Sequence, residues 1–380
     1  MNLFKKLIPY LLIAAVLVSV FAVWKTNPID YERGNSETIS YLKAKVLSVN
    51  SQSLEESEGL PGRMKGEQNI TVRFTSGKLK GREVTLDNML SEEHSVEVAK
   101  GTKIIVKCDT PENVTPYYTV YEYDRTVGII AALAVFLVLI VLVGRSKGLK
   151  AALALFVSVV LIAGGMLPLL YNGKSAVAVT FVICFVITMV TLLLLNGFSA
   201  KTWVAILSTL IGLFASSVFY ILMESILSLT GYSLDETPDL IMITRHTGLK
   251  LSEILFSGIL LSSLGAVMDT AMSIASSLFE ILSVEPKMKQ KELFASGINI
   301  GRDMIGTMCQ TLILAFTGSS VAFLLVMLSY NTRFHQFLSS EFLAVELLQA
   351  LTGSLAVILT VPITAYISAS VGRKIFKRSM

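Results

Sequence analysis

Two aspartates lie inside long apolar stretches of this sequence, where ionised groups are rare. Asp269 follows the run SSLGAVM, and Asp303 follows Arg302 in NIGRDMIGTMCQT, which also contains Gln310. An ionised carboxylate in hydrocarbon costs about 2.5–3.5 kcal/mol on insertion scales, so such residues usually face a charged partner or a wet cavity. The chemistry that these residues could carry is cation binding or proton transfer within a membrane.

Polar residues recur at helical spacing in the last three apolar segments. Steps of three and four place each set on one helix face. The sets are Gly258, Ser262, Gly265, Asp269, Ser273, Ser276 and Glu280; Asp303, Thr307, Gln310, Leu314 and Thr317; and Glu346, Gln349, Gly353, Ala356, Thr360 and Thr364. We expect these faces to meet one another or water. The candidate pathway or ion-binding residues are Asp269, Ser273, Asn299, Arg302, Asp303, Thr307, Gln310 and Glu346.

Close helix packing is the alternative explanation for the serines and glycines of these sets. Small residues let helix backbones approach, and buried hydroxyls form interhelical hydrogen bonds of about 0.6–2 kcal/mol. Packing does not need carboxylates, although Arg302 could pair with Asp269 as a structural ion pair. Gly265 and the Gly297–Gly301 pair are natural points for a helix break, where freed backbone groups can line a site.

An enzymatic site is the least favoured reading of these acids. The sequence has no HExxH helix motif and no GxSxG elbow. A dyad of Asp269 and Asp303 would need both carboxyls within hydrogen-bond reach, with the pKa of one raised by its neighbour. We therefore expect no catalytic residues, no cofactor and no metal. The acids at 235, 236 and 239 with His246 could hold a metal ion, but a solvated loop is favoured there.

The composition indicates a multi-pass membrane protein. Of 380 residues, 53% are hydrophobic and 16% charged, against about 25% charged residues in soluble domains. A span needs about 20 apolar residues. Eight stretches qualify, at about 7–24, 126–144, 149–170, 175–195, 202–228, 252–278, 304–330 and 345–371. The modest net charge of +4 implies no nucleic-acid partner.

The distribution of basic residues predicts the orientation of the spans. Cytoplasmic loops are rich in Lys and Arg. An N-terminus inside, with eight spans, places most of the basic residues of the short loops inside and both chain ends in the cytoplasm. Residues 25–125 then lie outside. No small-residue cleavage site follows the first apolar run, so we expect residues 1–24 to be a retained anchor.

Residues 25–125 differ from the rest of the chain and predict a small β domain. Five short alternating runs, at 39–49, 69–75, 82–86, 103–107 and 117–121, are punctuated by glycines, as strands and turns are. They favour a curled sheet or an OB-like barrel. Residues 51–66 are acidic and then contain Pro and Gly, so we expect a flexible loop there. Residues 126–380 form the third part, a seven-helix transmembrane domain.

Local signals within this membrane part predict turns and a kink. Asn172-Gly173 and Asn196-Gly197 predict tight turns between antiparallel neighbours. Gly164, Gly165 and Pro168 predict a kink or break near the end of the third span.

The segments SSLGAVMDTAMSIASS and ELFASGINIGRDMIGTMCQTLILAFTG resemble the most characteristic stretch of the YibE/F family of multi-pass bacterial membrane proteins. The resemblance covers roughly residues 125–375. It implies an N-terminal anchor, an outer domain and a membrane bundle in the bacterial cytoplasmic membrane. It carries over Asp269, Asn299, Arg302 and Asp303 as motif residues without assigned roles.

The sequence supports two functional hypotheses. The first is a transporter or permease for a small solute or ion, with a polar pathway between the last three helices. The second is a non-transporting scaffold or sensor whose outer β domain binds an envelope partner. In either case the partners that we expect are the lipid bilayer and a second membrane protein of the same family or another copy of this chain.

Overall fold

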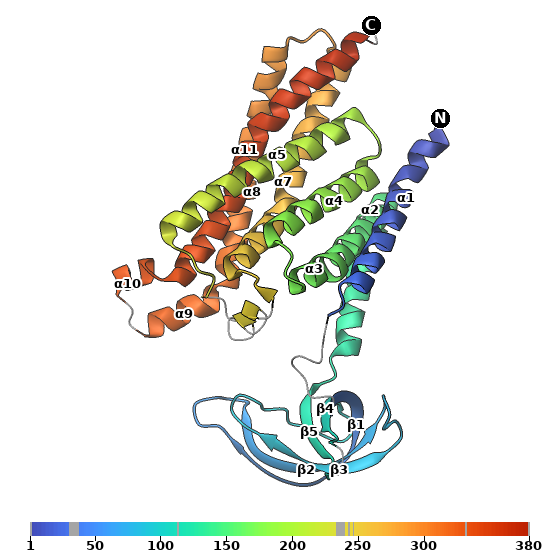
Figure 1. The fold of residues 1–380 in the computed structure, drawn as a ribbon, viewed down its shortest axis with the longest axis vertical. Helices are drawn as coiled ribbons and strands as arrows, with labels where there is room; N and C mark the ends of the chain where they lie inside the picture. The colour runs from blue at the N-terminus through green and yellow to red at the C-terminus, as the bar shows by residue number, and fades with distance from the viewer. Residues whose placement is uncertain are drawn as a thin grey trace. The chain divides into compact units, whose positions relative to one another are not determined.

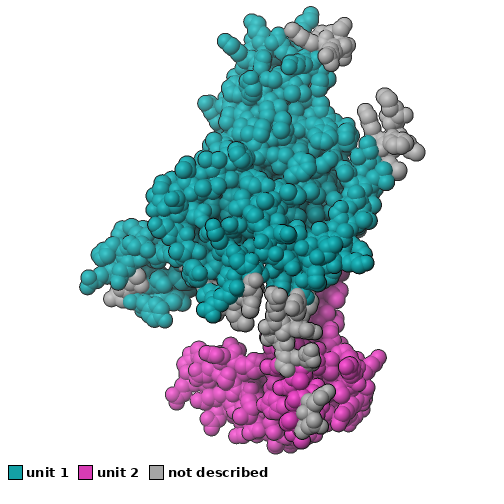
Figure 2. Space-filling view, in the orientation of Figure 1, with its two compact units in different colours: residues 1–29, 140–380 teal, residues 30–139 magenta. Residues whose placement is uncertain are grey.

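The chain forms two compact units in a computed structural model. It describes residues 2–29, 38–111, 114–232, 240–241, 244–245, 247–330 and 333–378. One unit comprises Met1–Ile29 and Ile140–Met380, and the other Asp30–Leu139 (Figure 2). The first unit is helical, whereas the second holds a curled five-stranded sheet and the first turns of a helix.

The five predicted strands are confirmed. They are β1 (Ile39–Glu56), β2 (Met64–Phe74), β3 (Glu83–Leu90), β4 (Lys103–Asp109) and β5 (Tyr117–Tyr123). Neighbours pair antiparallel in the order β3-β2-β1-β4-β5. Alternation along each strand sends one face inward, so that Ile70, Val72 and Ile104 are fully buried. β1 is the central strand and carries two register irregularities, which increase its twist and curl the sheet.

The expectation of a flexible loop over residues 51–66 is wrong for most of that stretch. β1 continues to Glu56 and β2 begins at Met64, so the two strands form a long ribbon with Glu55 opposite Lys65. Backbone hydrogen bonds and cross-strand side-chain pairs stabilise such a ribbon. It therefore does not need the alternation of apolar residues from which a strand can be predicted. Only the turn around Gly59 and Gly62, both at positive φ, is outside the strands.

Two buried amides attach an irregular segment to the sheet. Gln68 Nε2 donates to the carbonyl of Val98 at 3.1 Å, and the Val98 amide donates to Gln68 Oε1 at 3.0 Å. Asn88 Nδ2 donates to the carbonyl of Val96 at 2.8 Å. Because a buried, unpaired backbone group is costly, these side chains replace a sixth strand and bring Val96 and Val98 into the core.

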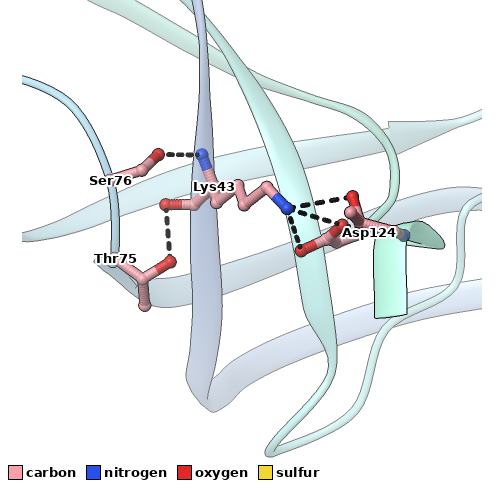
Figure 3. Close-up of polar contacts among 5 residues, drawn as sticks. Lys43, Thr75, Ser76 and Asp124 are labelled. Carbon is pink, nitrogen blue, oxygen red and sulfur yellow. Dashed lines mark hydrogen bonds and ion pairs between the residues drawn. The ribbon is translucent and has the colours of Figure 1, made fainter. Parts of the chain in front are cut away.

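A polar cluster around Lys43 joins the sheet to the helix that follows it (Figure 3). Lys43 Nζ donates to Thr126 Oγ1 at 2.9 Å and lies 3.3 Å from both carboxylate oxygens of Asp124. The Thr126 amide donates to Asp124 Oδ1, which caps the start of α2. The backbone of Lys43 is itself held by Thr75 and Ser76. The first turn of α2 is therefore attached to the central strand.

The helical unit contains long apolar helices and several short ones (Figure 1). They are α1 (Asn2–Thr26), α2 (Thr126–Val160, whose first turns lie in the other unit), a π-helical turn (Leu161–Met166), α3 (Leu167–Tyr171), α4 (Ala176–Asn196), α5 (Ala200–Leu227), α7 (Leu251–Val284), α8 (Gln290–Ser319), α9 (Val321–Ser329), α10 (Phe334–Leu338) and α11 (Glu341–Arg378). Among the described residues, six helices are long and apolar enough to cross a membrane. The pair α8 and α9, bent by 54°, brings this number to seven if it is one span.

The apolar run Thr126–Tyr171 is 46 residues long and is interrupted at Arg145. Residues eight apart in a continuous helix are separated by about 12 Å. A Cβ placed on Gly148 would instead collide with the carbonyl oxygen of Ile140. The chain therefore turns back between these two residues, where Arg145 has φ 48°.

The predicted turns and the predicted kink are confirmed. Gly173 and Gly197 adopt φ of 73° and 72°, which glycine tolerates without strain. The kink takes the form of the π-helical turn that contains Gly164 and Gly165. Val20 of α1 fills the space beside Gly164, where a Cβ would lie 2.7 Å from Val20 Cγ1.

The expected helix breaks at Gly265 and at Gly297–Gly301 do not occur. α7 is continuous from Leu251 to Val284, and α8 runs through both of its glycines. A Cβ on Gly297 would lie 2.8 Å from Ala365 Cβ, and one on Gly301 would collide with Val361. These glycines therefore serve close packing of α8 against α11.

Candidate functional site

Asp269 lies in a cleft of about 370 Å³ between α2, α4 and α7. The lining residues are Lys147, Thr191, Leu192, Leu195, Asn196, Gly265, Met268, Asp269 and Met272. The walls are mostly apolar, and the polar groups are one carboxylate, one ammonium, one amide and one hydroxyl. Such a combination is typical of small-molecule sites, where a few polar groups fix the ligand.

The helical period of α7 explains why Asp269 faces open space. Val267, Thr270 and Ala271 are fully buried against neighbouring helices, whereas Asp269 is exposed. Gly265, one turn earlier, has no atom within 4 Å of where a Cβ would lie. The cleft is therefore open at the level of this turn. Asn196, which ends α4 before Gly197, forms its other side.

The carboxylate of Asp269 has no ion-pair or hydrogen-bond partner among the residues that the structure describes. Lys147 lines the same cleft without pairing with it. Two other acids of the helical unit, by contrast, accept hydrogen bonds from backbone amides. Glu253 accepts from the Ala176 amide at 3.1 Å at the start of α4, and Glu341 accepts from the Thr230 and Gly231 amides at 2.6 and 3.0 Å. Those two acids are structural, whereas Asp269 is available to a ligand.

The candidate residues of α8 lie together on a different surface. Asn299, Arg302, Asp303, Thr307 and Gln310 are all exposed and follow one helix face. The opposite face of α8 packs on α11 through Leu293, Gly297 and Gly301. The polar residues of α8 therefore point away from α11.

The structure does not bring Asp269 together with Arg302 or Asp303. Arg302 Nη1 donates to Asn299 Oδ1 at 3.4 Å within its own helix. No described residue of α8 lines the Asp269 cleft. The ion pair of Arg302 with Asp269 and the Asp269–Asp303 dyad are thus not formed.

The two remaining candidates lie apart from the cleft lining. Ser273 is half-buried on α7, one turn beyond Asp269. Glu346 is half-buried near the start of α11, and its Oε2 is buried without a hydrogen-bond partner among the described residues. The residues at 235, 236, 239 and 246 lie outside the described part of the chain. Within the described part, no group of three His, Cys, Asp or Glu side chains could hold a metal ion.

Sequence reasoning missed Lys147, Thr191 and Asn196 as neighbours of Asp269. Lys147 is one of the basic residues of the short loops, and Asn196 belongs to a predicted turn; both positions are compatible with lining a cleft. Lys147 and Asn196 each lie at a helix end beside a turn. The turns bring both residues to the same level of α7, and this position is the signal that could have indicated them.

One comparison with known proteins gives a match. The family model described as YibE/F-like protein matches residues 132–374. No curated protein and no solved structure matches the chain.

Proposed function

This chain belongs to the YibE/F-like family, and we propose that it is a membrane transporter or permease in which Asp269 binds a monovalent cation or relays a proton. The observation that carries this proposal is an unpaired carboxylate in the middle of a 34-residue apolar helix, open to a cleft of about 370 Å³. An acid with no structural partner at such a position is costly to keep unless a hydrophilic species reaches it.

The cleft suggests where the solute pathway begins. The interface of α7, α8 and α11 is close-packed, with Ala365 and Leu278 against Gly297, and Ser263 against Gly353. A route between these three helices would have to separate them. The side of α7 that faces α4 already holds a cavity whose mostly apolar walls carry four polar side chains. We therefore place the entrance between α4 and α7 rather than between the last three helices.

The orientation of this transporter follows from its loops and helix breaks. We infer that the arms of Thr126–Tyr171 before and after Arg145 are separate spans, and that α8 with α9 forms one more, which gives eight spans. Basic loops then place both termini in the cytoplasm and the β unit outside a bacterial cytoplasmic membrane. With this orientation the Asp269 cleft, which Lys147 and Asn196 line, opens towards the cytoplasmic side.

Charge movement on a solid-supported membrane tests the proposed function. The purified chain, reconstituted in liposomes, is exposed to concentration jumps of Na⁺ or K⁺ and to pH jumps. We expect a transient current with at least one of these ions that exceeds the current of empty liposomes. Currents equal to those of empty liposomes for all three jumps would contradict cation binding or proton relay at Asp269.

A second candidate function, a sensor, is favoured by the attachment of the sheet to α2. The β unit has its own cleft of about 420 Å³, with Glu67, Asp87 and Tyr117 in its lining. Because Lys43 connects the central strand to Asp124 and Thr126 at the start of α2, a ligand held by the sheet could bias the position of that helix. The acidic lining suggests a cationic ligand.

Lys43→Met is expected to loosen the start of α2 without unfolding the sheet, because the Lys43 backbone keeps its bonds to Thr75 and Ser76. Hydrogen bonds from Thr126, and then from Lys43, lower the pKa of Asp124. Because its pKa is lowered, the Asp124 carboxylate stabilises the folded form at pH values above its ordinary pKa. This stabilisation is lost as the pH falls through the lowered pKa. The amides of residues 126–130 should therefore be less protected from exchange in Lys43→Met than in the wild type near neutral pH. In the wild type this protection, measured against the intrinsic exchange rate at each pH, should fall only in acid. Unchanged exchange in Lys43→Met would argue against the attachment.

A further inference from the structure

The exposed side of α8 carries several polar residues. Asn299, Arg302, Asp303, Thr307 and Gln310 lie on it, together with Gly306. We call these six residues the polar face of α8. Apart from a bond of 3.4 Å between Arg302 and Asn299, neither charged side chain of this face has a partner in the described part of the chain. Charged groups on a spanning helix almost always face protein or water rather than lipid.

We propose that the polar face of α8 is the interface between two copies of this chain. Arg302 and Asp303 are adjacent, so the face carries both members of an ion pair. In a two-fold symmetric contact, the same patch of each copy meets itself. Two copies inserted with the same topology have their α8 helices running in the same direction. Arg302 of one copy then faces Asp303 of the other within about one residue rise of 1.5 Å.

Gly306 allows the backbones to approach at this interface. Arg302, Gly306 and Gln310 succeed one another at steps of four and lie in one line along the helix. A Cβ on Gly306 would have no atom within 4 Å, in contrast to the filled positions at Gly297 and Gly301. α8 thus uses two glycines to pack on α11 and offers a third on its open side. Small residues at such positions are typical of contacts between membrane helices.

Gln310 gives the contact a second polar pair, one turn beyond Gly306. Side-chain amides on parallel helices that meet at a two-fold axis can donate to and accept from each other, which satisfies both in a site without water. The polar face of α8 can therefore make three contacts with a second copy. In order along the helix, these are an ion pair, a close backbone contact and an amide pair. This interface does not depend on the proposed transport function.

Disulfide cross-linking in native membranes tests the contact directly. Cys108, Cys184 and Cys309 are first replaced by alanine in the full chain, and Gln310→Cys, which leaves Gly306, Arg302 and Asp303 in place, is then introduced. A disulfide needs Cα atoms about 4.4–6.8 Å apart, so oxidation should give a dimer of this chain. Phe214→Cys on α5, which is 63% exposed, is the matched control and should remain monomeric. Absence of the Gln310→Cys dimer, or a cross-link to a different protein only, would overturn the proposal.

Charge exchange provides a readout that does not depend on the introduced cysteine alone. Arg302→Asp places acids opposite acids, and we expect the cross-linked fraction to fall by about tenfold or more, since a desolvated charge has then lost its partner. The double variant Arg302→Asp with Asp303→Arg restores complementarity and should restore cross-linking, which also shows that the altered chains fold. Equal cross-linking of the single and double variants, whether high or low, would contradict the ion pair across the interface.

Discussion

Asp269→Asn is expected to reduce the ion-induced current by about tenfold or more. A charged hydrogen-bonding interaction contributes about 1.5–3 kcal/mol, and each 1.4 kcal/mol corresponds to a tenfold change in binding. Asparagine keeps the shape of the side chain but can neither balance a cation nor carry a proton. The measurement is the amplitude of the current after a jump of the active ion, at equal amounts of reconstituted protein.

Glu280→Gln is the matched control for this effect. Glu280 lies on the same helix as Asp269, is exposed and does not line the cleft. Its neutralisation should leave the current unchanged, whereas Asp269→Glu should retain a substantial part of it. A current that Glu280→Gln reduces as much as Asp269→Asn would indicate a general loss of surface charge rather than a site at Asp269.

Gly301→Leu is expected to destabilise the helical unit strongly. A Cβ at this position already collides with Val361 of α11, and Ala365 occupies the equivalent space at Gly297. Overpacking typically costs about 1–3 kcal/mol and occasionally more, and here the backbones of two long helices would have to separate. We expect a lower melting temperature and a reduced yield of monodisperse protein in detergent.

Gly258→Leu on α7 provides the comparison for Gly301→Leu. No atom lies within 4 Å of a Cβ at Gly258, so this variant adds the same side chain to the same kind of helix without a collision. It should melt close to the wild type. Equal loss of stability in both variants would show that the effect comes from leucine in these helices and not from contact between α8 and α11.

Much of the architecture could be predicted from local patterns. The alternation of Ile70, Val72 and Phe74 predicts a strand with one buried face, and these residues are buried as expected. Asn-Gly pairs predict turns because glycine tolerates positive φ, which both glycines adopt. Local signals succeed where one residue decides the backbone conformation or where burial imposes a period.

The arrangement of the candidate site could not be predicted in the same way. Helical spacing shows that Gly265, Asp269 and Ser273 share a face, but it does not show which neighbour that face meets. The glycines of α8 illustrate the ambiguity, because a pair four residues apart is compatible with a helix break or with close packing. The position of α11 against these glycines shows that they serve close packing and not a helix break. Likewise, the role of Gln68 depends on a partner 30 residues away.

The proposed function requires that water reaches position 269, and thiol labelling tests this access most directly. In a chain without native cysteines, Asp269→Cys is treated in membrane vesicles with a charged, membrane-impermeant maleimide from each side. Glu280→Cys, on an exposed position, should react, and Ala271→Cys, at a fully buried position, should not. We expect Asp269→Cys to react from the cytoplasmic side at a rate closer to that of Glu280→Cys than to that of Ala271→Cys. A rate as low as that of Ala271→Cys from both sides would contradict it.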